Sequence, residues 1–184
     1  MTAVLVPDEE RRLLRVARLA LDARVRGSAP PEPDAAERGG GRSSAFVSIF
    51  LAGELRGCLG RLDSSLPLST LIGQLARAVA DSDPRFEPVR PEELASIGLE
   101  ISVLTREREI QAPEHIELGR HGLIVQHGTR RGLLLPQVPG EQGWDREAFL
   151  TCTCLKAGLD GDAWRRGARL FVFEAHVFGA RGGP

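Results

Sequence analysis

The order in which helical and extended hydrophobic patterns follow one another constrains this fold most. Apolar residues at helical spacing predict three helices, which cover residues 8–26, 67–80 and 145–158. Extended runs predict strands, which cover residues 46–51, 54–59, 97–105, 121–126, 132–138 and 168–178. Because this order lacks the strand–helix–strand alternation of a doubly wound sheet, it predicts the α+β class. We expect a largely antiparallel or mixed β-sheet flanked by helices, with a small subdomain.

The length of the chain and one segment rich in proline and glycine predict its domain organisation. A chain of 184 residues has the length of one domain, so we predict a single domain over residues 1–184. Residues 27–44 hold three prolines and a run of three glycines, a composition that cannot continue a helix and buries little. We therefore predict a flexible Pro/Gly-rich connection there.

Charge and composition argue against several classes of protein. Lys and Arg number 24 against 25 Asp and Glu, for a formal net charge of -1, whereas nucleic-acid binders usually carry a basic excess. No run approaches the roughly 20 apolar residues that cross a bilayer, so we expect neither a signal peptide nor a membrane anchor. The three cysteines are too few for a secreted disulfide scaffold, which favours the cytoplasm.

No metal or cofactor motif stands out. Cys152 and Cys154 are two residues apart on a predicted helix, so their side chains point about 200° apart around its axis and cannot both face one ion. We expect no metal and no cofactor. The single lysine, Lys156, stands among 23 arginines. It is either a chance survivor in an arginine-biased chain or a position that requires a compact ammonium group.

The segment Leu-Arg-Gly-Cys-Leu-Gly at residues 55–60 holds the candidate site. On a strand, Arg56 and Cys58 would share one face about 7 Å apart, where a guanidinium favours the thiolate. Gly57 and Gly60 lack a Cβ and would let a ligand approach the sulfur. Cys58 is therefore a candidate nucleophile or ligand-contact residue.

A purely structural interpretation of the same segment stays open. Cys58 would then be a small buried hydrophobic residue, since buried free cysteines are common. Arg56 would pair with Glu54 or Glu100, and the two glycines would relieve crowding in a twisted hairpin.

Five segments together resemble the AMMECR domain family, whose bacterial and archaeal members form protein A of the AmmeMemoRadiSam system. They are Leu-Arg-Gly-Cys-Leu-Gly at 55–60, Asp-Pro-Arg-Phe at 83–86, Glu-Ile-Ser-Val-Leu at 100–104, Gly-Leu-Leu-Leu-Pro-Gln-Val at 132–138 and Cys-Leu-Lys-Ala-Gly-Leu at 154–159. The first segment departs from the family pattern at Leu59, where isoleucine is usual. The resemblance implies an α+β domain, association with a Memo-like protein and a radical S-adenosylmethionine (SAM) protein, and no established reaction.

Two functional hypotheses follow. In the first, the chain is an enzyme or enzyme subunit that acts on a small molecule or a macromolecule. Its catalytic residues would be Cys58, Arg56 and Lys156, and its ligand-binding residues would be Gly57, Gly60, Asp83, Arg85 and Gln137. In the second, the chain is a non-catalytic module that positions a substrate for the two partner proteins, and Cys58 is tolerated rather than used.

Overall fold

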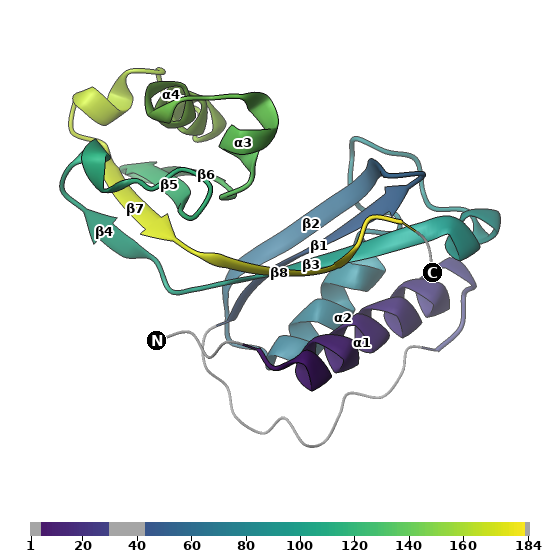
Figure 1. Cartoon of the computed structure of the whole chain (residues 1–184). Coiled ribbons are helices and arrows are strands. Elements are labelled where there is room, and N and C mark those ends of the chain that lie inside the picture. The colour runs from purple at the N-terminus through teal and green to yellow at the C-terminus, as the bar shows by residue number, and fades with distance from the viewer. Residues whose placement is uncertain (1–4, 30–42, 183–184) are drawn as a thin grey trace. The chain divides into compact units, whose positions relative to one another are not determined.

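In a computed structural model, which describes residues 5–29 and 43–182, the chain divides into two compact units (Figure 1). The first unit comprises the described residues up to 103 and from 176 onward, and the second comprises residues 104–175. The chain therefore leaves the first unit once and returns to it at its C-terminal end. Each unit has its own β-sheet and its own helices, which confirms the α+β class.

The first unit is a four-stranded sheet with two helices on one face (Figure 1). Its strand order is β2-β1-β3-β8, and the elements are α1 (Pro7–Val25), β1 (Ser43–Leu51), β2 (Glu54–Ser64), α2 (Leu68–Ala78), the 3₁₀ helix Pro91–Ser96, β3 (Ile97–Leu104) and β8 (Ala175–Ala180). Every second residue of β1 is fully buried against α1 and α2, namely Ala45, Val47 and Ile49. This alternation is the one expected for a strand covered on one face.

The second unit is a smaller four-stranded sheet with the order β4-β7-β5-β6. Its elements are β4 (Arg108–Ile110), the 3₁₀ helix Pro113–His115, β5 (Gly122–His127), β6 (Arg130–Leu134), α3 (Val138–Gln142), α4 (Arg146–Lys156), the 3₁₀ helix Ala163–Arg165 and β7 (Arg169–Phe173). The predicted cap of α4 is confirmed, because the Asp145 side chain accepts a hydrogen bond from the Ala148 N–H at 2.8 Å. Phe149 and Leu150 of α4 pack into a core of their own with strand residues of this sheet.

Several predicted strands differ from the observed ones. The run predicted as one strand over 168–178 is two strands, β7 and β8, which belong to different sheets and are separated by Glu174. The predicted strand 132–138 ends at Leu134, because Pro136 has no N–H to donate and Gln137 has helical backbone angles before α3. The strand β4 was not predicted at all.

The predicted connection over residues 27–44 falls largely outside the described residues, which resume at Ser43. Ser43 and Ser44 belong to β1, so the prediction ran too far at that end. None of the helices in the described part of the chain has the length and apolar composition that a membrane span requires.

Candidate functional site

The segment 55–60 lies on β2, which is one of the two edge strands of the first sheet. Ala52 and Gly53 both have positive φ angles, as in the tight turns that join two neighbouring strands. The pairing of β1 with β2 then shifts by one residue, from Phe50 opposite Leu55 to Ile49 opposite Gly57. Arg56 is left without a residue opposite, as in a β-bulge.

This bulge decides which face of the sheet carries the thiol. A hairpin with the same turn and no bulge would put Cys58 opposite Val47, whose side chain is fully buried against the helices. With the bulge, Cys58 lies opposite Ser48. Because a shift of one residue exchanges the two faces of a strand, Cys58 comes to the face away from α1 and α2, where it is half-buried.

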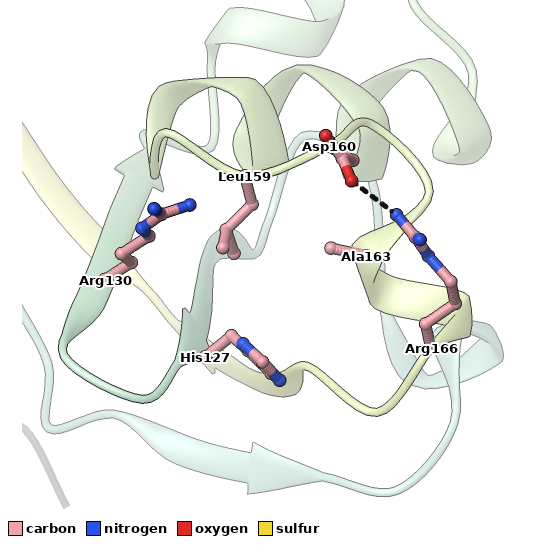
Figure 2. Close-up of a pocket in the computed structure, with 6 residues that line it drawn as sticks. All are labelled: His127, Arg130, Leu159, Asp160, Ala163 and Arg166. Atoms are coloured by element: carbon pink, nitrogen blue, oxygen red, sulfur yellow. Dashed lines mark hydrogen bonds and ion pairs between the residues drawn. The ribbon is translucent and has the colours of Figure 1, made fainter.

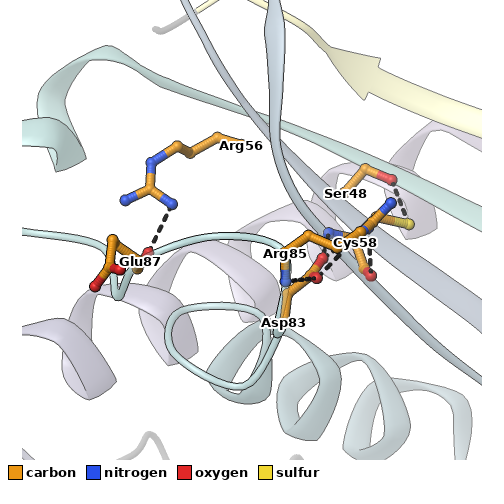
Figure 3. A network of polar contacts seen from close by, with 6 residues as sticks. All are labelled: Ser48, Arg56, Cys58, Asp83, Arg85 and Glu87. Atoms are coloured by element: carbon orange, nitrogen blue, oxygen red, sulfur yellow. Dashed lines mark hydrogen bonds and ion pairs between the residues drawn. The ribbon is translucent and has the colours of Figure 1, made fainter.

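The hydrogen bonds of the Arg56 side chain go to residues other than Cys58. Its guanidinium donates to the Glu93 carboxylate at 2.9 Å, to the Glu87 carbonyl at 2.8 Å and to the Pro88 carbonyl at 3.2 Å. Figure 3 shows this side chain turned away from Cys58. The hydrogen bond from Arg56 lowers the pKa of Glu93 below its usual value, against the opposing effect of burial. The structural interpretation expected Arg56 to pair with Glu54 or Glu100, but its carboxylate partner is Glu93.

Asp83 and Arg85 lie directly against Cys58 (Figure 3). The buried Asp83 carboxylate accepts the Cys58 N–H at 2.9 Å and two guanidinium bonds from Arg85, at 3.0 and 2.7 Å. The Arg85 hydrogen bonds hold the pKa of Asp83 well below its usual range, although burial acts in the other direction. Asp83 thus binds an outward-facing N–H of the edge strand, and it is too weak a base for proton transfer near neutral pH.

Ser48 contacts the Cys58 thiol, and Arg85 contacts the backbone of the same residue. The Ser48 hydroxyl donates to Cys58 Sγ at 3.2 Å, and the Arg85 guanidinium lies 3.5 Å from the Cys58 carbonyl oxygen. Attraction to Cys58 also contributes to the raised pKa of Arg85, after the larger effect of its hydrogen bond to Asp83. A hydroxyl donor and a guanidinium both favour a thiolate. Arg85, rather than Arg56, is therefore the cation that interacts with Cys58. Ser48 is a site residue that was not predicted.

Protein groups fill the space beside the two glycines. A Cβ on Gly60 would lie 2.2 Å from the Phe46 ring, and a Cβ on Gly57 would lie 3.0 Å from Val79 Cγ2. The missing Cβ at each glycine therefore leaves room for a side chain of the first unit, as the structural interpretation expected. Their role in ligand binding stays a prediction.

Lys156 and Gln137 belong to the second unit, so they share neither a sheet nor a core with the Cys58 segment. Lys156 is exposed in the last turn of α4, where a positive charge is favourable beside the helix C-terminus. Gln137 immediately precedes α3. A Cβ on Gly132 would lie 2.3 Å from the Ala157 backbone nitrogen, so the segments 132–138 and 154–159 meet through backbone packing.

The second unit has a cavity of about 310 Å³ that the sequence analysis did not predict (Figure 2). It is lined by His127, Arg130, Leu159, Asp160, Ala163 and Arg166. Arg166 is paired with Asp160 at 2.8 Å and with Asp162 at 2.6 Å, and Arg130 donates to the Gly158 carbonyl at 3.0 Å. Both arginines of this cavity are therefore engaged within the fold. Among the described residues, no three His, Cys, Asp or Glu side chains gather as ligands for a metal ion.

Comparison with known proteins places the chain among relatives of similar length. A family model described as AMMECR1 matches residues 14–178. A protein of Methanothermobacter thermautotrophicus is 42% identical over 188 residues, which cover 96% of this chain and 96% of that protein. Protein MK0488 of Methanopyrus kandleri is 45% identical over 159 residues, which cover 81% of this chain and 75% of that protein.

The fold is also similar to a solved structure. The crystal structure of the uncharacterized protein PH0010 from Pyrococcus horikoshii superposes with a TM-score of 0.84 at 36% sequence identity, over 94% of this chain and 93% of that one. The match to the family model covers most of the chain, and the Methanothermobacter thermautotrophicus protein is similar over 96% of its length. The chain therefore belongs to the AMMECR1 family.

Proposed function

We propose that the chain is a binding component that presents the Cys58 thiol on the sheet face away from α1 and α2. There the thiol contacts a small molecule or a macromolecule. The observation that carries the proposal is the pairing of the Cys58 sulfur with the Ser48 hydroxyl at 3.2 Å, with the Arg85 guanidinium nearby. Both groups stabilise negative charge on sulfur, and a thiolate is the form of cysteine that attacks or coordinates.

In this proposal the chain does not catalyse a reaction by itself. A reaction at a thiolate also needs a group that delivers a proton to the leaving atom. Among the described residues, the side chain hydrogen-bonded to the sulfur is Ser48, and the adjacent Asp83 carboxylate has a strongly lowered pKa. The missing acid or base would therefore come from the substrate or from a partner protein.

The partners that the family resemblance implies fit this division of work. A Memo-like protein and a radical SAM protein would supply the chemistry, and this chain would hold the substrate through Cys58. The proposal places this work in the cytoplasm, where the free Cys58, Cys152 and Cys154 stay reduced.

A second candidate, a scaffold in which Cys58 is not used, is favoured by a different observation. Arg56 and Asp83 are both engaged in bonds that close the free edge of β2. Such bonds give Arg56 and Asp83 a structural role that does not involve the thiol. The scaffold predicts partner binding that is insensitive to the thiol.

A binding experiment separates the two candidates. Binding to a Memo-like protein and to a radical SAM protein is measured for the wild type, for Cys58→Ala and for Cys58 carboxamidomethylated by iodoacetamide. Cys152→Ala is the matched control, because Cys152 is also half-buried but lies in the second unit. The proposal expects a complex that the two changes at Cys58 weaken and the control does not. A complex unaffected by either change would reject it and leave the scaffold.

A further inference from the structure

We propose that the second unit binds the phosphate group of a small molecule in a cavity lined by Arg106, Arg108 and His121. This cavity has a volume of about 300 Å³, and its remaining lining residues are Thr105, Val172, Phe173 and Glu174. The volume is at the lower end of the range for small-molecule sites. All of these residues belong to the second unit, so the proposal does not depend on Cys58.

The local sequence separates charges onto two faces. In Arg106-Glu107-Arg108-Glu109, successive side chains of an extended segment point to opposite sides. Glu107 pairs with Arg131, and Glu109 pairs with Arg169 at 2.8 Å. Arg131 and Arg169 both lie over the Phe171 ring, at 5.9 and 4.9 Å from its centre. Both carboxylates are therefore neutralised on the Phe171 face.

Arg106 and Arg108 take the other side and line the cavity. Neither guanidinium has a hydrogen-bond or ion-pair partner within residues 5–29 and 43–182. Arg166 of the other cavity differs in this respect, because two aspartates hold it. Two unpaired guanidinium groups at one cavity form a site for an anion with several oxygens, because each can bind two phosphate oxygens at once.

His121 adds a donor of fixed orientation. Its side chain is buried, and Nδ1 accepts the Glu117 N–H at 3.1 Å. A backbone N–H only donates, so the neutral ring must carry its proton on Nε2. Nε2 has no partner in the described part of the chain, and the residue lines the cavity. The ring is therefore held ready to donate to a bound oxyanion.

The one carboxylate that lines the cavity does not cancel this charge. Glu174 accepts from Arg120 at 3.0 Å, and Arg120 also binds Glu117 at 3.1 Å. Thr105 fixes the backbone beside it, because its hydroxyl accepts the Glu174 N–H at 2.9 Å. Val172 and Phe173 supply an apolar wall for the carbon part of a phosphate ester.

The test is a calorimetric titration of the full chain with inorganic phosphate at constant ionic strength, for the wild type, Arg108→Gln and Arg130→Gln. Both variants remove one cation from an exposed position of the second unit, but Arg130 lines the other cavity. We expect saturable binding that Arg108→Gln weakens about tenfold, the effect of losing one charged hydrogen-bonding group, while Arg130→Gln retains the wild-type affinity. Absence of saturable binding, or equal losses in the two variants, would overturn the proposal.

A parallel titration with succinate distinguishes phosphate from carboxylate ligands. The proposal expects phosphate to bind more tightly, because its oxygens match the two arginines and the imidazole together. Tighter binding of succinate than of phosphate would reject phosphate as the ligand.

Discussion

Replacing Asp83 with asparagine tests how far the carboxylate beside Cys58 stabilises the first unit. The Asp83 carboxylate accepts four hydrogen bonds, from the N–H groups of Cys58 and Arg85 and from two nitrogens of the Arg85 guanidinium. Asparagine keeps one acceptor oxygen but puts an NH₂ donor where the other oxygen was. Two of the four donors would then face a donor.

The expected loss follows from the strength of such bonds. A hydrogen bond to a charged group contributes about 1.5–3 kcal/mol, but the Arg85 side chain is 56% exposed, so water replaces part of what it loses. Allowing for this screening, Asp83→Asn should lower the free energy of unfolding by about 2–3 kcal/mol near neutral pH. Chemical denaturation followed by circular dichroism measures this difference. Asp81→Asn is the control, because Asp81 pairs with a half-exposed Arg24 and should lose less than about 1 kcal/mol.

The contribution of Asp83 to the free energy of unfolding should fall in acid. The pKa of Asp83 is lowered in the folded state, mainly by Arg85, so its contribution is complete above the unfolded-state pKa of about 4. The contribution is lost as the pH falls below that value towards the folded-state pKa. The wild type and Asp83→Asn should therefore converge in stability as the pH falls below about 4. A variant as stable as the wild type at pH 7, or a difference that widens in acid, would refute this reasoning.

Three further predictions test other parts of the account. Gly60→Ala should lower the free energy of unfolding by about 1–3 kcal/mol, because its Cβ overlaps the Phe46 ring; the double variant with Phe46→Ala should show a smaller added loss than the two single changes together, and strict additivity would contradict the contact. Glu93→Gln should cost about 1–3 kcal/mol in the same denaturation assay, because it weakens the bonds that hold Arg56; wild-type stability would show that these bonds do not matter. Cys154 is fully buried and burial raises its thiol pKa, so peptide mass spectrometry should find it unalkylated in native protein and modified after unfolding.

Much of the first unit could be predicted from local pattern. Pro7 and the acidic residues behind it indicate where α1 begins, and Ala52-Gly53 indicates the turn between β1 and β2. These signals depend on residues that are close together in the sequence, so they can be recognised without the structure. The break at Glu174 escaped prediction because it depends on two sheets that share one extended run.

The candidate site shows the same limit more sharply. Two-residue spacing predicted Arg56 beside Cys58, but the bulge and the distant partners of Arg56, Glu87 and Glu93, turn it elsewhere. Contacts over 30 or more residues leave no local pattern, so the partners of Arg56 could not be inferred. Ser48 is close to Cys58 in the sequence, but the one-residue bulge that places the two opposite each other has no signature in the residues themselves. Asp83 and Arg85 were predicted as ligand-binding residues, and their part in binding stays a prediction.

The most direct test of the central claim, that Ser48 and Arg85 activate the Cys58 thiol, is its alkylation rate by iodoacetamide as a function of pH. Peptide mass spectrometry reads the rate at Cys58 in the wild type, Ser48→Ala, Arg85→Gln and Arg56→Gln. The account predicts slower alkylation of Cys58 near neutral pH in Ser48→Ala and in Arg85→Gln, and the wild-type rate in Arg56→Gln. A rate that falls only in Arg56→Gln, or in none of the variants, would contradict it.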